Sequence, residues 1–250
     1  MSAALLVAQN VTKRFGGLVA VDDVSLTLMR GELHAVIGTN GAGKSTFVNV
    51  LAGEFPPSAG SLQLLGHDIA GWSQPRRALA GLGRSYQRTT IFPQFSVLEN
   101  CRLPAQAHAQ HPLNWWSPAA RCKQSGDAAL AALELVGLAQ AQAMQAGLLS
   151  HGQKRSLEIA MCLATQPKVL LLDEPLAGMG AEETERMLAL LQSLKKAHAI
   201  LLVEHDMDAV FRVADQITVM VNGRVIASGA PAAIRSNAQV QTAYLGEAHS

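Results

Sequence analysis

The chain has 250 residues, of which 49% are hydrophobic and 16% are charged, so it is long enough for one large domain or for a core with a subdomain. Its formal net charge of +1 gives no overall field that would recruit nucleic acid, and we interpret basic pairs such as Arg76-Arg77 and Lys154-Arg155 as solvated helix faces. The three cysteines are odd in number and form no Cys-x-x-Cys pair, which argues against a disulfide framework or a structural zinc site and favours a reducing cytosol.

The first ten residues, MSAALLVAQN, lack the basic start and the long apolar stretch of a signal peptide. No uncharged run along the chain approaches the ~20 residues that a membrane-spanning helix requires. We therefore expect a chain that is soluble by itself.

A glycine-rich motif at Gly38–Thr46 is the first segment with clear chemical content. Its sequence, GTNGAGKST, fits the pattern G-x-x-x-x-G-K-[ST] and follows an apolar run at 33–37 that is typical of a buried parallel strand. The next residues predict a helix with an apolar face, ended by Gly53. In this context the glycines let backbone N–H groups face phosphate oxygens, Lys44 neutralises the β- and γ-phosphates, and the Ser45 hydroxyl binds Mg²⁺. The motif predicts a phosphate-binding loop.

A different composition begins near Thr89 and continues to Gly147, where Ala, Gln and Leu dominate. Asp127 is followed by apolar residues at positions 130, 133 and 136, which predicts a helix capped by Asp127 and ended by Gly137. We interpret this segment as a helical subdomain inserted into an α/β core.

The stretch LLSHGQKRSLEIA, at positions 148–160, places polar residues at the start of an apolar helix. Ser150 and Gln153 fit a capping box, and the helix is expected to end before Pro167. A helix N-terminus also attracts anions, yet this one lies in the inserted segment and cannot easily fold back onto the chain's own phosphate loop. We therefore expect it to contact a phosphate that another molecule holds.

Two carboxylates follow an apolar run at 169–172, and a histidine closely follows another at 199–203. Asp173, Glu174 and His205 would all lie at the carboxyl edge of a parallel sheet, where α/β sheets bind ligands. Asp173 can hold Mg²⁺ through water, and Glu174 can orient and deprotonate an attacking water. His205 can bond a γ-phosphate or keep Glu174 and the water aligned.

Two amphipathic helices and a hairpin complete the α/β pattern. Apolar stripes at helical spacing run from Met187 to Leu194 and from Met207 to Ala214. Asn222-Gly223 separates two apolar runs and suits a type I′ turn, which predicts a hairpin near one end of the core.

Together these motifs resemble those of the ATP-binding subunits of ABC transporters, over almost the whole chain. The resemblance implies an α/β fold: a P-loop NTPase (ABC ATPase) core with an N-terminal antiparallel β subdomain and an inserted α-helical subdomain. Residues 1–88 and 156–250 would form the RecA-like core with the β subdomain, and residues 89–155 the helical subdomain with the signature loop. The chain would be a single nucleotide-binding domain that hydrolyses ATP with Mg²⁺.

The resemblance also assigns site residues. Phe15 matches the aromatic that stacks on adenine, Gln87 the Q-loop residue and His205 the switch histidine. The expected catalytic residues are Glu174 and His205. The residues expected to bind ATP are Phe15, Gly38, Thr39, Asn40, Gly41, Ala42, Gly43, Lys44, Ser45 and Thr46. The expected Mg²⁺ site consists of Ser45, Gln87 and Asp173, and the loop expected to close on a second cassette's ATP consists of Ser150, His151, Gly152 and Gln153.

Two positions depart from the family pattern. His151 stands where the signature usually has glycine, a position at which relatives vary. Gly180 stands where the D-loop commonly carries Asp or Asn, so a polar side chain that links the two sites of a dimer is missing. Symmetric coupling between two sites is not implied for this chain.

Several longer stretches resemble the ATPase subunits of branched-chain amino-acid importers: KRFGGLVAVDDVSL, GRSYQRTTIFPQFSVLENCRLPAQ, the region containing NWWSP and the ending TAYLGEA. Importers of urea and short-chain amides belong to the same branch, and the lipopolysaccharide-export ATPase has a similar tail, so the cargo stays open. Outside transport, the alternatives are a P-loop kinase, which would need an Arg-rich lid, and a soluble ABC ATPase, which would carry paired cassettes or a long coiled coil.

The implied partners are a second ATP-binding subunit, identical or paralogous, and transmembrane permease subunits, with a periplasmic solute-binding protein acting indirectly and no nucleic acid. The implied location is peripheral, on the cytoplasmic face of the inner cell membrane. The segment from Gln87 to Leu103 would pass motion to permease loops, with Phe92 and Phe95 as apolar anchors. For Trp115-Trp116 an anchoring role and a place in the subdomain core are equally compatible with the sequence.

Overall fold

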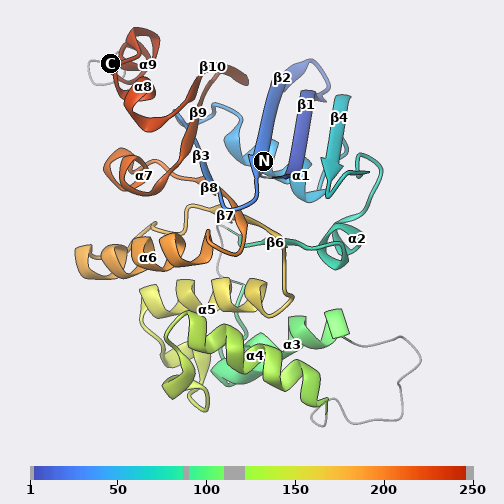
Figure 1. The fold of residues 1–250 in the computed structure, drawn as a ribbon, viewed down its shortest axis with the longest axis vertical. Helices are drawn as coiled ribbons and strands as arrows, with labels where there is room; N and C mark the ends of the chain where they lie inside the picture. The colour runs from blue at the N-terminus through green and yellow to red at the C-terminus, as the bar shows by residue number, and fades with distance from the viewer. Residues whose placement is uncertain (1–2, 87–89, 110–121, 246–250) are drawn as a thin grey trace.

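The computed structural model describes residues 3–86, 90–109 and 122–245. Its upper part contains two sheets, and a helical lobe lies below them in the view of Figure 1. The smaller sheet is antiparallel, with strand order β2-β1-β4-β5. Its strands are β1 (Ala4–Phe15), β2 (Leu18–Met29), β4 (Ala59–Leu64) and β5 (His67–Asp68).

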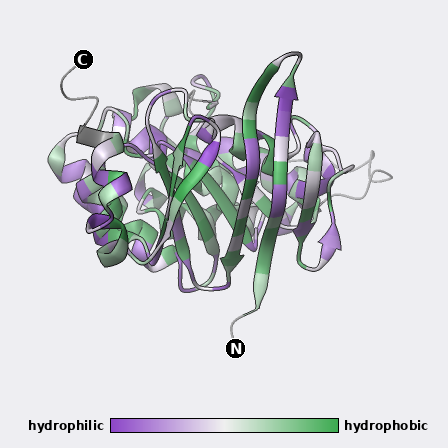
Figure 2. Cartoon of the chain, turned by 90° about the horizontal axis from the view of Figure 1, so that it is seen from above, coloured by the Kyte–Doolittle hydropathy of each residue, from purple (hydrophilic) through white to green (hydrophobic). Residues whose placement is uncertain are grey.

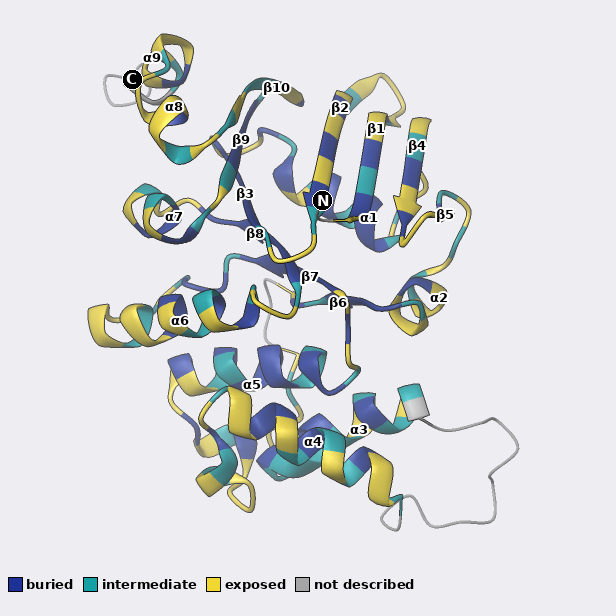
Figure 3. Cartoon of the chain, in the orientation of Figure 1, coloured by how far each residue is buried: buried dark blue, intermediate teal, exposed yellow. Residues whose placement is uncertain are grey.

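The larger sheet has the strand order β10-β9-β3-β8-β7-β6 and is parallel from β9 to β6. Its strands are β3 (Leu33–Gly38), β6 (Leu82–Arg84), β7 (Val169–Asp173), β8 (Ala199–Val203), β9 (Gln216–Val221) and β10 (Arg224–Gly229). All residues of β3, β7 and β8 are buried, because elements cover both faces of the sheet (Figure 3), and these strands read as continuous apolar runs. The predicted strands at 33–37, 169–172 and 199–203 are therefore confirmed.

The hairpin predicted around Asn222-Gly223 is also confirmed. Strand β10 pairs antiparallel with β9, with Arg224 opposite Val221. Asn222 and Gly223 both have positive φ, at 48° and 81°, as a type I′ turn requires.

Helices pack on both sides of the large sheet. Those that connect or follow its strands are α1 (Lys44–Ala52), α2 (Gln74–Leu79), α6 (Ala181–Leu194), α7 (Met207–Val213), α8 (Pro231–Arg235) and α9 (Ala238–Leu245). Helix α1 ends at Gly53, which adopts the left-handed conformation and donates its N–H to the carbonyls of the last turn, as predicted. In Figure 2 the strands of the large sheet are predominantly hydrophobic, in keeping with their place between these helices and the small sheet.

The lower lobe consists of α3 (Val97–Ala109), α4 (Lys123–Leu135), α5 (His151–Leu163) and the short 3₁₀ turns η2 (Ala139–Ala141) and η3 (Ala146–Leu148). The expectation that Asp127 caps a helix was wrong, because α4 begins one turn earlier. Ser125 is fully buried and donates its hydroxyl hydrogen to the Cys122 carbonyl. Packing of this first turn therefore places the start of the helix on the N-terminal side of Asp127. The predicted lobe boundary between residues 155 and 156 falls inside α5, and the division of the chain into subdomains stays a prediction.

The interpretation of Arg77 and Arg155 as solvated was wrong. The Arg77 side chain is 1% exposed and Arg155 is also buried, whereas Arg76 is exposed and stacks its guanidinium 4.1 Å from the Trp72 ring centroid. Arg77 donates five hydrogen bonds to backbone carbonyls, two of them on the last turn of α1. A sequence pair of basic residues therefore separates into one surface cation and one internal one.

A single apolar cluster joins the lower lobe to the large sheet, since buried residues of α3, α4, α5 and α6 pack together with Leu170 and Leu172 of β7. A second cluster fills the space between the two sheets and α1, and a third lies under α7, α8 and α9. Among the described residues, every helix is too short or too polar to span a lipid bilayer.

Candidate active site

The phosphate loop connects β3 to α1 in a conformation that its glycines permit. Gly43 caps α1 at φ 93°, and a Cβ there would lie 2.3 Å from the carbonyl oxygen of Ala20. A Cβ at Gly38 would lie 2.2 Å from the Met220 carbonyl oxygen. Both positions exclude a side chain, so the backbone of the loop stays close to its neighbours and leaves the N-terminus of α1 open to an anion.

Lys44 is buried and folds back over the loop. Its Nζ atom donates to the carbonyl oxygens of Gly38 at 2.7 Å and Thr39 at 2.8 Å. A buried ammonium needs such partners, because burial without them is costly. The cation is thereby held at the phosphate loop itself, where a phosphate group can also reach it.

A pocket of about 520 Å³ lies in front of the loop. Its walls are residues 40–46 of the loop, Glu174 from the end of β7, residues 18–20, and the hairpin tip Asn222-Gly223. Gly223 donates its N–H to the Ala42 carbonyl and accepts a bond from the Asp22 N–H. The sequence suggested the turn but not its place beside the phosphate loop, because that contact depends on how β9 and β3 pair.

Asp173 ends β7 and fits the predicted role as a cation ligand. Its side chain is 4% exposed, and its Oδ1 atom has no hydrogen-bond partner among the described residues. Burial raises the pKa of this carboxyl and nearby Glu174 acts in the same direction, whereas the charges of Arg84 and Lys44 lower it. A buried carboxylate oxygen without a partner among the described residues fits a hard divalent cation.

Glu174 has an unusual backbone conformation, with φ at 49°, in the left-handed region that few residues other than glycine adopt. Its N–H donates to the carbonyl of Val203 on the neighbouring strand β8. The turn places the residue in the wall of the phosphate pocket. Strained backbone that the surrounding structure holds in place is frequent at functional sites.

His205 follows β8 and has a side chain that is 62% exposed. The residue before it, Glu204, is completely buried, and sequence reasoning missed it. Glu204 accepts bonds from the N–H groups of Leu176, at 2.8 Å, and His205, at 3.2 Å. Burial raises the pKa of Glu204. A charged residue directly after an all-apolar strand was the available signal.

Phe15, predicted to stack on a base, lies at the end of β1 and is 41% exposed. Its ring meets that of Phe55 edge-on, with centroids 5.3 Å apart, and Lys13 Nζ lies 4.9 Å from its centroid. A ring that remains 41% exposed beside these neighbours leaves surface on which another ring can stack.

The Ser150 loop faces a different pocket, of about 560 Å³, that shares no lining residue with the phosphate pocket. The predicted capping box is confirmed: Ser150 Oγ accepts from the Gln153 N–H, and Gln153 Oε1 accepts from the Ser150 N–H. Ser150 Oγ also donates to Glu183 Oε1 at 3.1 Å, a contact the sequence did not suggest. His151, the unusual residue of this loop, lies with Nε2 3.0 Å from the Ala177 carbonyl oxygen.

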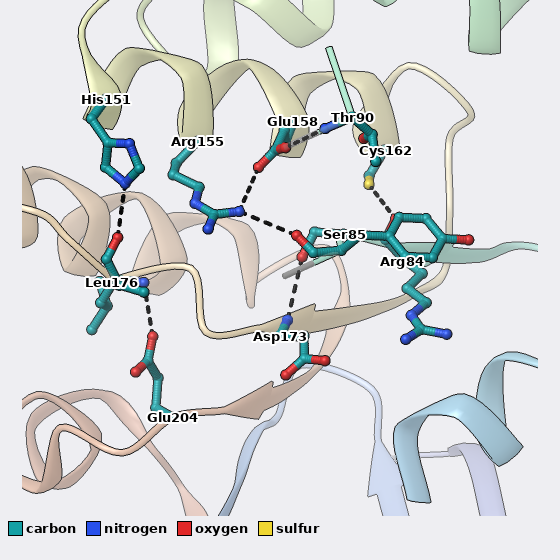
Figure 4. Close-up of polar contacts among 12 residues, drawn as sticks. Arg84, Ser85, Thr90, His151, Arg155, Glu158, Cys162, Asp173, Leu176 and Glu204 are labelled. Carbon is teal, nitrogen blue, oxygen red and sulfur yellow. Dashed lines mark hydrogen bonds and ion pairs between the residues drawn. The ribbon is translucent and has the colours of Figure 1, made fainter. Parts of the chain in front are cut away.

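Helix α5 also binds the chain on both sides of Gln87, although Gln87 itself lies outside the described residues. Arg155 Nη1 donates to the Tyr86 carbonyl and forms a buried ion pair with Glu158 at 2.9 Å (Figure 4). Glu158 Oε1 accepts from the Thr90 N–H. Burial raises the pKa of Glu158, against the effect of these two partners.

Comparison with known proteins agrees with this geometry. Residues 21–177 match the model of the ABC transporter family, and residues 224–250 match that of the branched-chain amino acid ATP-binding cassette transporters. The chain belongs to the ABC transporter family. It is 41% identical over 257 residues to the high-affinity branched-chain amino acid transport ATP-binding protein LivG of Salmonella typhimurium, and 38% identical over 255 residues to BraF of Pseudomonas aeruginosa. Each alignment covers 99% of this chain and 100% of the relative.

Among solved structures, the ADP conformation of MJ1267, an ATP-binding cassette of an ABC transporter, superposes on this ABC ATPase with a TM-score of 0.88 at 30% identity. The match covers 98% of this chain and 100% of that chain. The predicted family, ATPase class and fold class are therefore confirmed. The individual residue roles stay predictions, as does the location of Trp115-Trp116, which lie outside the described residues.

Proposed function

We propose that this chain is the ATP-hydrolysing subunit of an importer for branched-chain amino acids or related small polar solutes, bound peripherally to the cytoplasmic face of the cell membrane. LivG and BraF, which align with this chain from end to end, are named as branched-chain amino acid transport ATP-binding proteins and so support the proposal. The match of residues 224–250 to the branched-chain amino acid ATP-binding cassette family supports it as well. The arrangement of the two phosphate sites carries the mechanistic part.

The two candidate phosphate sites line separate pockets with no residue in common. The loop at 40–46 offers Lys44 and a helix N-terminus, whereas Ser150 offers a hydroxyl at the N-terminus of α5. Each pocket is lined by only one of the two sets of candidate phosphate-binding groups. We infer that two copies, or this chain and a paralogue, face each other so that the Ser150 loop of each contacts the γ-phosphate held by the other.

Within one pocket, Lys44 holds the β- and γ-phosphates by exchanging its bonds to Gly38 and Thr39 for bonds to phosphate oxygens. Ser45, Asp173 and Gln87 would hold Mg²⁺, which neutralises charge that develops on the phosphates. The Oδ1 atom of Asp173, which has no hydrogen-bond partner in the described part of the chain, supports this assignment. Phe15 stacks on the adenine ring.

For hydrolysis, Glu174 accepts a proton from the water whose oxygen attacks the γ-phosphorus. The bond from the γ-phosphorus to the bridging oxygen breaks, and ADP and phosphate leave. His205 donates to a γ-phosphate oxygen and keeps the water aligned. The position of Glu174 in the wall of the phosphate pocket supports its role as the base.

ATP contacts both chains only in the closed pair, so its higher affinity for that state shifts the population toward closure. Hydrolysis removes the shared γ-phosphate and with it this preference. Opening and closing of the pair would then drive the permease.

The permease contact is proposed at a cavity of about 310 Å³ between the lower lobe and the core. Residues on both sides of Gln87, Tyr86 and Thr90, line it together with Pro104 of α3 and Met161 of α5. On the same lobe, Phe92 and Phe95 are exposed and stack 5.4 Å apart, which is the apolar anchor that a permease loop needs. A periplasmic solute-binding protein would act only through the permease.

The role of the base is tested with Glu174→Gln, which keeps the size of the side chain but cannot accept the proton. ATP hydrolysis should fall by roughly 10²- to 10⁴-fold while ATP binding persists. Phosphate release and binding of a fluorescent ATP analogue measure the two quantities. Near-normal turnover would assign the base to another residue.

The contact between chains is tested with a cysteine reporter. The chain carries Ser150→Cys, Lys44→Ala and Glu174→Gln, and its native cysteines are replaced. ATP alone should protect this thiol poorly from alkylation, because the chain's own phosphate loop has lost its cation. Adding a thiol-free chain with intact Lys44 should restore protection, increasingly so at higher protein concentration. Equal protection without the second chain, at any dilution, would mean that Ser150 contacts phosphate in its own chain.

Permease binding is tested with Phe92→Ala and Phe95→Ala, which should weaken recruitment to membranes that contain the permease but leave ATP affinity intact. A joint loss of ATP affinity and recruitment would show instead that the two rings are structural.

A further inference from the structure

The most deeply buried charge near the proposed reaction centre is the carboxylate of Glu204. It follows the last residue of β8, and its side chain is completely buried. Burying a carboxylate is costly unless hydrogen bonds compensate it. An apolar side chain would continue the run of β8 at no such cost, so packing alone does not account for a glutamate here.

The two carboxylate oxygens of Glu204 bond to two different loops. Oε1 accepts from the Leu176 N–H at 2.8 Å, two residues after Glu174, as Figure 4 shows. Oε2 accepts from the His205 N–H at 3.2 Å and lies 3.9 Å from Nδ1 of the His205 ring. One side chain therefore joins the loop after the proposed base to the proposed γ-phosphate contact.

The segment that Glu204 holds is also bound on its other side. Ala177, next to Leu176, receives the contact from Nε2 of His151 at the start of α5. Glu174 leaves its strand through a left-handed turn, with its own N–H bonded to Val203, the residue before Glu204. A turn of this kind persists only where its surroundings hold it in place.

We propose that Glu204 is a positioning residue for ATP hydrolysis, which fixes Glu174 and His205 relative to each other by accepting the N–H groups of Leu176 and His205. The inference rests on the roles proposed above for Glu174 and His205. A displacement of about 1 Å in a reacting group can cost about 10²-fold in rate, so two hydrogen bonds that set this geometry have a large effect.

The test is Glu204→Gln in the full-length chain. The amide has nearly the same shape, but only one of its two terminal atoms accepts a hydrogen bond, so its NH₂ group faces one of the two backbone N–H groups. We expect kcat to fall by about 10- to 100-fold. The KM and affinity for ATP should stay within about twofold, because Lys44 and the phosphate loop are unchanged. The melting temperature should change little, because the loss of one buried hydrogen bond and the removal of a buried charge oppose each other.

Glu204→Asp is made alongside and covers the case in which the amide variant does not fold. It keeps the charge but withdraws the carboxylate by one methylene from both N–H groups, so the same loss of kcat at unchanged ATP affinity is expected. The matched control is Glu185→Gln, which removes an exposed carboxylate paired with Arg212 and should leave kcat within about twofold.

A double-mutant cycle asks whether Glu204 acts through His205. In a His205→Ala background, Glu204→Gln should reduce the residual kcat less than in the wild type, because one of the two groups it positions is already absent. If the losses of kcat in the two single variants are fully additive in the double variant, Glu204 does not act through His205. A folded Glu204→Gln or Glu204→Asp variant with normal kcat would overturn the proposal, and so would an equal loss of kcat and ATP affinity. If Glu174→Gln lowers turnover as expected and Glu204→Gln leaves kcat unchanged, only the role of Glu204 fails. If Glu174→Gln keeps near-normal turnover, the proposed assignment of Glu174 as the base fails first.

Discussion

Replacing Arg77 by methionine should show how strongly an internal cation supports the phosphate-loop helix. The guanidinium donates to the carbonyls of Val50 and Leu51, at 2.8 and 2.7 Å, in the last turn of α1. It also donates to the carbonyls of Ile69, Ala70 and Trp72, in the segment that leads to α2. The cation therefore lies at the negative end of the α1 dipole and ties that end to a distant part of the chain.

The magnitude follows from these bonds. A hydrogen bond to a charged group contributes about 1.5–3 kcal/mol net, and three of the five bonds are 2.8 Å or shorter. Recovering the hydration of the guanidinium in the unfolded chain offsets part of this, and burial indeed lowers the pKa of Arg77. We expect Arg77→Met to destabilise the fold by about 3–5 kcal/mol, which lowers the melting temperature of a chain of this size by roughly 10 °C.

Urea denaturation followed by circular dichroism measures the free energy of unfolding, with Arg76→Met as the matched control on the same helix. Arg76 is exposed and loses only its stacking on Trp72, so the control should cost at most about 1 kcal/mol. A difference between the two variants below about 1 kcal/mol would refute the reasoning, because it would mean that the five carbonyls find other partners without loss.

Three further predictions concern other parts of the chain. Gly43→Ala should lower ATP affinity by at least about 10-fold in a nucleotide-binding assay, because the new Cβ meets the Ala20 carbonyl at 2.3 Å; unchanged affinity would contradict this. Arg155→Met leaves Glu158 buried without its cation and should destabilise by about 3–5 kcal/mol in urea, with part of the loss regained when Glu158→Leu is added. Burial lowers the pKa of His198, so the native state favours the neutral ring and loses stability as pH falls below about 6.5. His198→Asn should flatten the dependence of the urea midpoint on pH between about 7.5 and 5.5, and an unchanged slope would exclude this titration as its cause.

Much of the fold was predictable because its strongest signals are local. The strands at 33–37, 169–172 and 199–203 are covered on both faces, so each shows as an unbroken apolar run. The loop at Gly38–Thr46 and the turn at Asn222-Gly223 depend on backbone conformations that glycine makes possible. Such features need no knowledge of distant neighbours.

Internal charges were harder to predict, because their partners lie far away in the sequence. Arg77 is buried because carbonyls from residues 50 and 51 end next to it, and Glu204 because the N–H of Leu176 turns toward it. Glu183 reaches Ser150 across 33 positions. Composition and periodicity carry no information about these backbone groups. Charged residues such as Arg77 are therefore predicted to lie at the surface when only the sequence is used.

The contacts of helix α5 couple two binding events thermodynamically. Its N-cap is Ser150, which we assign to a second chain's nucleotide, and its Arg155 and Glu158 hold the backbone beside the proposed permease cavity at Tyr86 and Thr90. Two ligands that act on one rigid element are linked, and linkage is reciprocal. If permease binding raises the affinity of the pair for ATP by some factor, ATP binding must raise the affinity of the pair for the permease by the same factor. Each factor of ten corresponds to a coupling free energy of about 1.4 kcal/mol. A substitution at Arg155 that removes one of these effects must therefore remove the other to the same extent.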